Sequence, residues 1–421
     1  MKTKIITIAV LLVTSVSLFG DSVFKKKARV LLVDDDKKEC PNAGFTKIQT
    51  AVDAAVSGDI IQVCPGTYDE QVQIAKPLSL VGIERNGKNA AVLRPSNITI
   101  NADFLGTPTA SIILVRDTAD VSIKNITVDG INNGLVCDST FPTMDGIFFR
   151  NASGQIEAVA IKNILSPQAC AFADALDVLS TGEQAQRLTV TNSSMHDYDI
   201  AGIEVIGGGL IAEIDRNVVT GRGATAFGQA GIQFSGGAAG SIEENVVTNH
   251  VTADFSVSNF VSGNIGVFQA AGNATIAKNI VGNSNVGIFV GAFPDIGSNN
   301  VTVVDNTVFD SDVFAGIFVK GDDNLVEGNT ITNSGLTESN FVHRGGVFAQ
   351  GTNNRIQDNT INEAVTGLLV STGNNLSDNH LFNTVVTQTV FVPQASAESG
   401  LASLPQTGVT SPTVLRKRLS R

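Results

Sequence analysis

An asparagine-centred repeat constrains the fold of this chain more than any other feature. Its copies read IDRNVV, IEENVV, IAKNIV, VVDNTV, VEGNTI and IQDNTI, and SDNHL closes the series. An aliphatic residue stands three positions before each asparagine, and another stands two positions after it. Apolar residues on both sides of a tight corner predict two short strands around one core, and Asn tolerates the left-handed backbone of such a corner. We expect these asparagines to stack in a hydrogen-bonded ladder: Asn217, Asn245, Asn279, Asn306, Asn329, Asn359 and Asn379.

A second motif, a glycine within a short aliphatic segment, precedes each of these asparagines. The glycines are separated by 21 to 35 residues, at Gly202, Gly231, Gly266, Gly287, Gly316, Gly346 and Gly367. Such a spacing with variable insertions is typical of a solenoid whose loops lengthen on one side. The segments are short, rich in β-branched residues and without helical periodicity. The sequence therefore predicts an all-β fold, a single parallel β-helix.

The composition agrees with one continuous domain. The 421 residues include 41 Gly and no Trp, and only 16% are charged. The repeats run without a break that would divide two domains, and we expect a monomer. The chain has 40 acidic and 28 basic residues, which argues against nucleic acid or an anionic membrane surface as the partner.

The two ends of the chain differ from the repeats. Residues 1–20 predict a signal peptide, because Lys2 and Lys4 precede an apolar stretch, Ile5–Leu18, that is too short to span a membrane. No other long apolar run follows, so we expect a secreted, periplasmic or cell-surface protein without a transmembrane segment. Residues 393–421 predict a disordered tail. Its LPQTG resembles a sortase motif but lacks the apolar stretch of a sorting signal, so we interpret it as a chance match.

The four cysteines of an exported chain predict disulfides. Sequence alone allows three connectivities. Proximity along the chain favours Cys40 with Cys64 and Cys137 with Cys170.

The segment FTKIQTAVDAAVSGD, residues 45–59, predicts one amphipathic helix. Thr46 and Gln49 fit a capping box, and Gly58 is a helix-ending residue. Its apolar face consists of Ile48, Val52 and Ala55. An open solenoid end exposes core, so we expect this helix to cap the N-terminal end.

The N-terminal segment from Phe45 to Ile83 resembles the opening of the pectate-lyase-like superfamily of right-handed parallel β-helices. The matching motifs are IQTAVDAAVSGD, PGTYDE at 65–70 and KPLSLVG at 76–82. They are similar to those of pectin methylesterases and of exported β-helix proteins related to the copper-site assembly protein of nitrous oxide reductase. The resemblance implies a right-handed parallel β-helix, which we place at residues 28–392. The catalytic segments of pectin methylesterases are not found, and a chain without Trp cannot carry their GRPW-like segment.

Acidic residues between Asp145 and Glu204 are the candidates for chemistry. In DALDV the alternation of a strand turns Leu176 and Val178 inward and Asp177 outward, and Glu204 in AGIEV is outward one coil later. Adjacent coils lie about 4.8 Å apart, so these two carboxylates are expected side by side. Asp145 and Asp174 begin matching strands.

Three interpretations of these acids remain open. Asp177, Glu204, Asp174 and Asp199 could form a catalytic set, because FADALDV followed by YDIAG resembles the aspartate segments of polygalacturonase-type hydrolases. The His-Gly and Arg-x-Lys segments of that family are not found. Alternatively, Asp145, Asp174, Asp177 and Glu204 could bind calcium, with Arg150, Arg216 or Arg222 as a base. Finally, the acids could be ordinary solvated loop residues.

A row of phenylalanines is predicted on the outside of the solenoid. In GIFV the aliphatic residues face the core, so the intervening Phe faces out at Phe268, Phe289, Phe318 and Phe348, with Leu369 continuing the row. Exposed aromatic rows usually contact something. The row could bind a ligand or partner, or it could be covered by a loop or by the chain's own C-terminal segment.

The sequence thus predicts an exported β-helix protein that engages carbohydrate or surface matrix, with no catalytic set that can be assigned. A polysaccharide lyase or glycoside hydrolase acting on acidic glycans is the alternative, with calcium as the cofactor. An envelope assembly factor is a third possibility, which rests on the resemblance alone.

Overall fold

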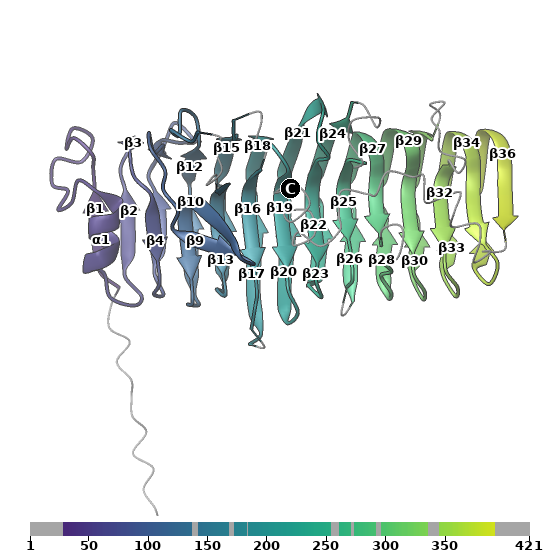
Figure 1. Ribbon diagram of the computed structural model, residues 1–421, viewed down its shortest axis with the longest axis horizontal. Helices are drawn as coiled ribbons and strands as arrows, with labels where there is room; N and C mark the ends of the chain where they lie inside the picture. The colour runs from purple at the N-terminus through teal and green to yellow at the C-terminus, as the bar shows by residue number, and fades with distance from the viewer. Residues whose placement is uncertain are drawn as a thin grey trace, which may run out of the picture.

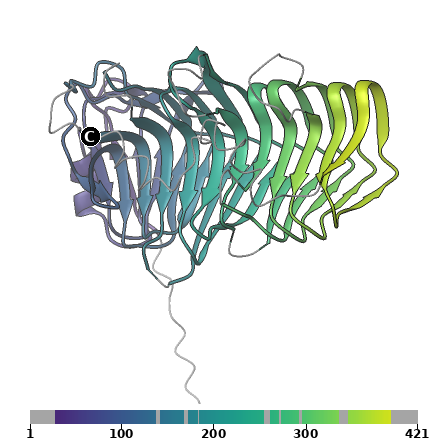
Figure 2. The same ribbon diagram turned by 45° about the vertical axis from the view of Figure 1, so that its right-hand side comes forward.

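The computed structural model describes residues 28–136, 142–167, 172–182, 184–253, 261–270, 273–291, 296–335 and 345–391. Their strands are stacked along one axis from α1 to β36, as Figures 1 and 2 show. Nearly every pairing between neighbouring coils is parallel. The chain is therefore a parallel β-helix, as predicted.

One side of the solenoid is a continuous parallel sheet of 13 strands, here called sheet A. Its strands, in order along the axis, are β1 (Val30–Val33), β2 (Ile60–Val63), β5 (Ser79–Gly82), β11 (Val121–Lys124), β14 (Gly154–Glu157), β17 (Gln186–Thr191), β20 (Leu210–Asp215), β23 (Ala239–Glu243), β26 (Ala274–Ala277), β28 (Val301–Val304), β30 (Leu325–Glu327), β33 (Arg355–Gln357) and β35 (Asn375–Ser377).

Two further rows of strands complete each coil. Row B follows the asparagine corner and contains β3 (Gly66–Tyr68), β8 (Ala91–Leu93), β12 (Ile126–Asp129), β15 (Ala160–Ile164), β18 (Ser194–Tyr198), β21 (Val218–Thr225), β24 (Val246–Thr252) and β31 (Thr330–Ser334). Row C leads back to sheet A and contains β4 (Val72–Ile74), β10 (Thr107–Arg116), β13 (Thr143–Arg150), β16 (Ala173–Leu179), β19 (Ala201–Ile206), β22 (Ala230–Ser235), β25 (Gly263–Val267) and β32 (Gly345–Gln350). Four long strands run through both rows: β27 (Ile280–Val290), β29 (Thr307–Lys320), β34 (Thr360–Ser371) and β36 (His380–Phe391). Antiparallel pairing occurs between β6 (Glu84–Arg85) and β7 (Lys88–Asn89), and between β9 (Ala102–Phe104) and β10.

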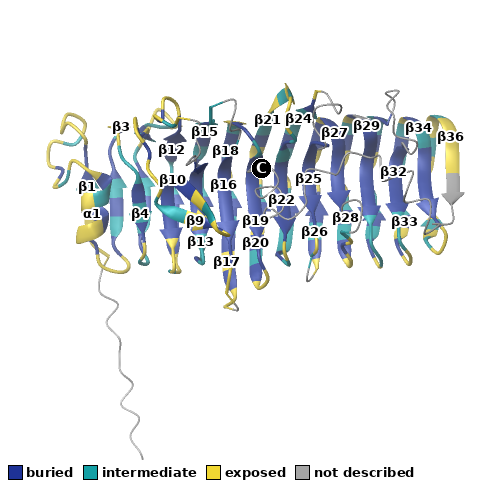
Figure 3. Ribbon diagram, in the orientation of Figure 1, coloured by how far each residue is buried: buried dark blue, intermediate teal, exposed yellow. Residues whose placement is uncertain are grey.

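A single apolar core runs through the stack, because the inward residues of sheet A and of both rows pack against one another. Figure 3 shows strands that are mostly buried, with exposed residues concentrated in the turns and on β36. Among the described residues, no helix has both the length and the apolar character needed to cross a membrane.

The asparagine ladder is present, but the reason for asparagine at its corner differs from the prediction. The left-handed residue is the one before each asparagine, at Arg216, Glu244, Lys278, Asp305, Gly328, Asp358 and Asp378. The asparagine itself is needed for the hydrogen bonds of its side-chain amide. In each rung except the last, Asn379, the backbone N–H and the side-chain Nδ2 both donate to Oδ1 of the next asparagine, as Asn217 does to Asn245 at 2.8 and 3.0 Å.

A second ladder lies at the other end of the sheet A strands and was not predicted. The backbone N–H of Asn324 donates to Oδ1 of Asn354 at 2.9 Å, and that of Asn354 donates to Oδ1 of Asn374 at 3.0 Å. These residues precede β30, β33 and β35, and the first ladder follows the same strands. Each of these three-residue strands is therefore held by asparagine hydrogen bonds at both ends.

The glycine motif marks the bend between rows B and C. A Cβ at Gly202 would lie 2.3 Å from a side-chain carbon of Val219, and a Cβ at Gly316 would lie 2.5 Å from Ile331. Both neighbours are inward residues of row B, so only glycine fits at the bend. The predicted Gly266 is an exception, because Asn264 takes this place in its coil and Gly266 pairs with Phe289.

Helix α1 (Ile48–Ala54) is shorter than predicted and is capped differently. It buries Ile48, Ala51 and Val52 at the N-terminal end of the solenoid. The predicted capping box is wrong, because the N-cap residue is Lys47 and has no side-chain capping bond. Instead the Glu70 carboxylate accepts hydrogen bonds from the backbone N–H groups of Ile48 at 2.7 Å and Gln49 at 2.9 Å.

The disulfide predicted between Cys40 and Cys64 is present, with 6.4 Å between the two Cα atoms. Cys137 and Cys170, the second predicted pair, lie outside the described residues.

Candidate functional site

A column of outward residues in register runs along row C. From the N-terminal end it reads Leu114, Phe148, Asp177, Glu204, Gln233, Gly266, Phe289, Phe318, Phe348 and Leu369. Three polar side chains form its centre, with apolar residues on either side. This polar centre is the candidate site.

Asp177 and Glu204 are register partners on neighbouring strands, β16 and β19, as the strand alternation predicted. Gln233 follows on β22, and its Nε2 donates to Oε1 of Glu204 at 2.8 Å. Asp177 is 0% exposed and Glu204 is 8% exposed, so the pair is buried within strands and is not a set of solvated loop residues. Two neighbouring carboxylates in a buried place favour either a shared proton or a cation.

Two more aspartates reach the same place because the strand alternation is broken at the row C bend. Ala175 and Leu176 are consecutive, yet both belong to the inner core. Asp174 and Asp177 therefore both face outward, one on each side of these two residues. Asp145 is the register partner of Asp174 on β13. One oxygen each from Asp145, Asp174 and Asp177 lies within 4.8 Å of the other two.

Neighbouring groups fix two of these carboxylates. Ser111 Oγ donates to Oδ2 of Asp145 at 3.1 Å, and the backbone N–H of Ala201 donates to Oδ1 of Asp174 at 2.7 Å. Calcium takes carboxylate oxygens at about 2.3–2.6 Å, so two of its ligands are at most about 5 Å apart. The donor set and its spacing therefore suit calcium, with Glu204 on the next coil.

Asp199 lies at the edge of this cluster, where β16 begins. Its backbone N–H donates to the carbonyl of Ala173 at 3.1 Å. Its carboxylate accepts from Ser166 Oγ at 2.7 Å and from the guanidinium of Arg222 at 2.6 Å. Burial raises the pKa of Asp199 above its usual range, although Ser166 and Arg222 act in the opposite direction. A buried carboxyl with a raised pKa is a group suited to proton transfer, and Arg222 places a positive charge beside it.

The other two candidate arginines are placed differently. Arg216 lies at the asparagine corner, between sheet A and row B, and forms an ion pair with Asp215. Arg150 ends β13, and its Nε donates to the carbonyl of Asp103 at 3.1 Å. Arg222 is therefore the one of the three that contacts a candidate acid.

The phenylalanine row is outward but buried. Phe289, Phe318 and Phe348 are 0–2% exposed and form a cluster that is separate from the inner core. Phe314 packs on this row, with ring centroids 5.4 Å from Phe318 and 5.5 Å from Phe348. Phe268 is two residues out of register, and its ring lies over Gly266. The sequence left open whether this row binds a ligand or partner or is covered by the chain itself. The burial of these rings favours cover by the chain itself.

A buried polar network inside rows B and C escaped the sequence reasoning. The hydroxyl of Tyr198 contacts Nε2 of His250, and Nδ1 of His250 lies 2.5 Å from Oδ1 of Asn264. Burial lowers the pKa of His250 to about 4, and it raises that of Tyr198, together with the charge of Asp174. His250 is 0% exposed in β24. The one available signal was Asn264, which replaces the glycine of the bend motif.

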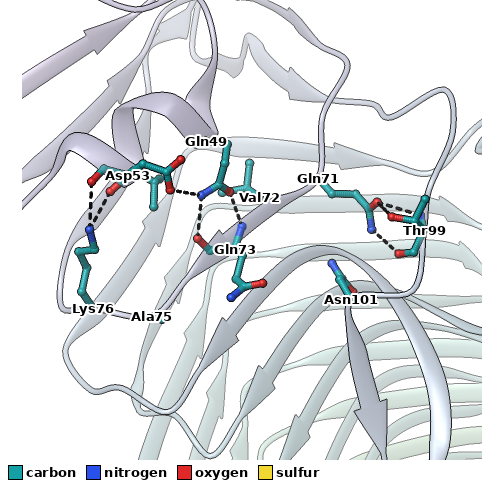
Figure 4. A pocket seen from close by; sticks show the side chains of 10 residues that line it. Gln49, Asp53, Gln71, Val72, Gln73, Ala75, Lys76, Thr99 and Asn101 are labelled. Atoms are coloured by element: carbon teal, nitrogen blue, oxygen red, sulfur yellow. Dashed lines mark hydrogen bonds between the residues drawn. The ribbon is translucent and has the colours of Figure 1, made fainter.

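A polar pocket of about 460 Å³ lies between α1 and β4. Figure 4 shows that its side chains bind one another and the backbone. Nε2 of Gln49 donates to Asp53 at 2.8 Å, and Nζ of Lys76 donates to the carbonyl of Ala55 at 2.9 Å. The Lys76 contact, together with the backbone N–H of Gln73, which donates to Oε1 of Gln49 at 2.7 Å, fastens the helix to the first coils.

No protein-family model matches this chain, and no curated protein matches its sequence. Several solved structures are similar to it. The Dettilon tailspike protein gp208 has 13% identity and a TM-score of 0.50, over 77% of this chain and 62% of that chain. The A-module of the Azotobacter vinelandii mannuronan C-5 epimerase AlgE4 has 14% identity and a TM-score of 0.49, over 82% and 93%. A mannuronic acid-specific polysaccharide family 6 lyase from human gut microbiota has 12% identity and a TM-score of 0.48, over 93% and 98%. The tailspike protein is a right-handed parallel β-helix protein, and this chain has the same fold.

Proposed function

We propose that this protein binds an acidic polysaccharide through calcium held by Asp145, Asp174 and Asp177, with Glu204 beside them. The observation that carries the proposal is the convergence of three aspartate oxygens within 4.8 Å of one another on the outer side of row C. Calcium held by protein carboxylates keeps further coordination positions, which uronate carboxylates and hydroxyls can fill. A uronate carboxylate adds a negative charge to the oxygen ligands that any sugar offers, so an acidic glycan is the ligand class that we assign to such an ion.

The chemistry that calcium would supply is charge neutralisation. The residues of this chain would hold and orient the ion. Ser111 orients Asp145, and the backbone N–H of Ala201 orients Asp174. Gln233 holds Glu204 by its amide, so a change at Gln233 would alter the position of Glu204.

Calorimetric titration with calcium tests the first half of the proposal. Wild type should bind one calcium at this cluster, and Asp174→Asn and Asp177→Asn should each weaken binding about tenfold or more, because affinity follows the number of charged ligands. Asp120→Asn is the matched control, since Asp120 is exposed and directly precedes β11 of sheet A, outside row C. Equal calcium binding by Asp177→Asn and wild type would sink the proposal.

Retention on polygalacturonate or alginate tests the second half. We expect wild type to bind these polymers in calcium and to be released by a chelator, whereas Asp177→Asn should not be retained in either condition. Calcium binding without retention on any polyuronate would contradict the assigned ligand class and leave the ion a structural role.

Asp199 favours a second candidate function, cleavage of the bound polymer by a lyase or a hydrolase. Its pKa is raised by burial, which moves the carboxyl toward the range that general acid–base chemistry uses, and Arg222 contacts it. The test is release of unsaturated uronides or reducing ends from the same polymers, compared between wild type and Asp199→Asn. Equal product release by the two proteins would exclude Asp199.

The proposed function also requires export and a sealed N-terminal end. We propose that residues 1–20 are removed as a signal peptide, that the solenoid spans 28–392 and that 393–421 form a tail. α1 would act as the cap, which its buried Ile48 and Val52 support. N-terminal sequencing of the protein from a secreting host tests the signal peptide, and retention of Met1 would contradict it.

A further inference from the structure

An acidic loop at the N-terminal end of the solenoid has no part in the site described above. Residues 34–39 read DDDKKE, so four carboxylates and two ammonium groups give the loop a formal charge of −2. The loop follows β1 on one side and meets the Cys40–Cys64 disulfide on the other. Both of its ends are therefore fixed.

Asp34 is the buried member of this loop. It is 0% exposed, and its Oδ2 accepts from the backbone N–H of Cys40 at 2.6 Å. Its Oδ1 is also buried and has no hydrogen-bond partner. A buried carboxylate oxygen without a partner is costly, which indicates that some group binds it in the functional protein.

Two exposed carboxylates meet Asp34 from the solvent side. One oxygen each from Asp34, Asp36 and Glu39 lies within 4.8 Å of the other two, which is the span of ligands around one calcium ion. Asp35 does not join them, because its Oδ2 accepts from the backbone N–H of Thr67 at 3.2 Å. The ammonium of Lys38 contacts Asp36, so a positive charge already partly compensates this cluster.

We propose that Asp34, Asp36 and Glu39 bind a second divalent cation, of which calcium is the best fit. The ion would replace the Lys38 ammonium on Asp36 and bind the unpartnered Oδ1 of Asp34. It would fasten the loop to the disulfide and thereby stabilise the first coil. The site shares no residue with the row C cluster, so either site can fail while the other holds.

The tyrosines of the chain make the two sites separately observable. The sequence has two tyrosines and no tryptophan. The hydroxyl of Tyr68 donates to the carbonyl of Cys64 at 2.9 Å and lies 3.3 Å from the carbonyl of Val33, next to Asp34. Tyr198 lies within reach of the charge of Asp174, in the row C cluster. Terbium, which replaces calcium, luminesces when a nearby tyrosine is excited.

The experiment titrates the full chain with terbium chloride under tyrosine excitation and then displaces terbium with calcium chloride. We expect a signal that Tyr68→Phe removes and Tyr198→Phe leaves. Asp34→Asn, which keeps an oxygen for the Cys40 N–H, and the exposed Glu39→Gln should each weaken terbium binding at this site about tenfold or more. Asp53→Asn, an exposed aspartate of α1, is the control and should change nothing.

The proposal is overturned if the Tyr68-dependent signal is absent, or if it persists with unchanged affinity in both Asp34→Asn and Glu39→Gln. Asp177→Asn distinguishes this inference from the proposed function. Its effect should be confined to the signal that depends on Tyr198.

Discussion

Asn306→Ala is the most direct test of what holds the coils together. The side chain of Asn306 is 1% exposed. Its Nδ2 donates to the carbonyls of Ile276 and Val304 and to Oδ1 of Asn329, at 2.9 to 3.0 Å. Its Oδ1 accepts from the backbone N–H and the Nδ2 of Asn279, both at 2.9 Å. Alanine removes all five contacts and leaves buried donors and acceptors on three neighbouring coils.

The expected cost follows from these five contacts. A net value of about 1 kcal/mol for each hydrogen bond gives about 4–5 kcal/mol, which is a large part of a typical unfolding free energy of about 5–15 kcal/mol. Guanidinium unfolding followed by circular dichroism measures the loss. Asn375→Ala is the matched control, because Asn375 is exposed in β35 and its change should stay within about 0.5 kcal/mol.

A cost for Asn306→Ala as small as that for Asn375→Ala would refute the reasoning. Changes at the neighbouring Asp305 test the backbone turn without touching the ladder. The φ of Asp305 is 55°, in the left-handed region, and its side chain is not one of the ladder asparagines. Asp305→Gly should therefore be nearly neutral, whereas Asp305→Val should cost about 1–2 kcal/mol in backbone strain.

Three further perturbations test the interior. Burial holds the pKa of His250 at about 4, below its usual 6.5, so the unfolded chain takes up a proton in this window and the folded chain does not; stability should be complete above pH 6.5 and fall by about 3 kcal/mol as the pH drops to 4. His250→Gln should lack this component of the pH dependence, and an unchanged pH profile would contradict a buried neutral histidine. Phe318→Ala should cost about 3–4 kcal/mol in the unfolding free energy, as for a core phenylalanine, while Phe382→Ala, at a 53% exposed position, should cost little; equal costs would mean that the row is open to solvent. Gly316→Ala should lower the thermal midpoint, because its Cβ would meet Ile331 at 2.5 Å, whereas Gly208→Ala has nothing within 4 Å and should be silent.

Regular repetition made much of this architecture predictable from the sequence. The two-residue alternation of a strand was enough to place Asp177 beside Glu204 and to turn Phe318 outward, because both lie in uninterrupted segments. The aliphatic residues around each asparagine likewise predicted the corners. Periodicity failed where a coil departs from it: Phe268 was assigned to the row by its spacing from Gly266, which is not the bend residue in that coil.

Non-local contacts account for the rest. The convergence of Asp174 with Asp177 depends on two successive inward residues, Ala175 and Leu176, which strict alternation does not allow. The capping of α1 depends on Glu70, more than twenty positions downstream of the residues whose N–H groups it accepts from. Burial of His250 depends on space left by Gly221 and Gly231, two glycines of the preceding coil, which no local motif reveals.

The asparagine ladder has a direction. Every rung before the last, Asn379, donates two hydrogen bonds toward the next coil. Every rung accepts hydrogen bonds from the coil before it, beginning with the backbone N–H of Ser193, which donates to Asn217. If the solenoid ended after any of these rungs, the same two donors, one backbone N–H and one side-chain amide, would lack their asparagine acceptor at the C-terminal end of the stack. The energetic defect at the growing end is therefore the same whichever coil is last. The ladder therefore sets the order in which coils stack and does not itself fix their number.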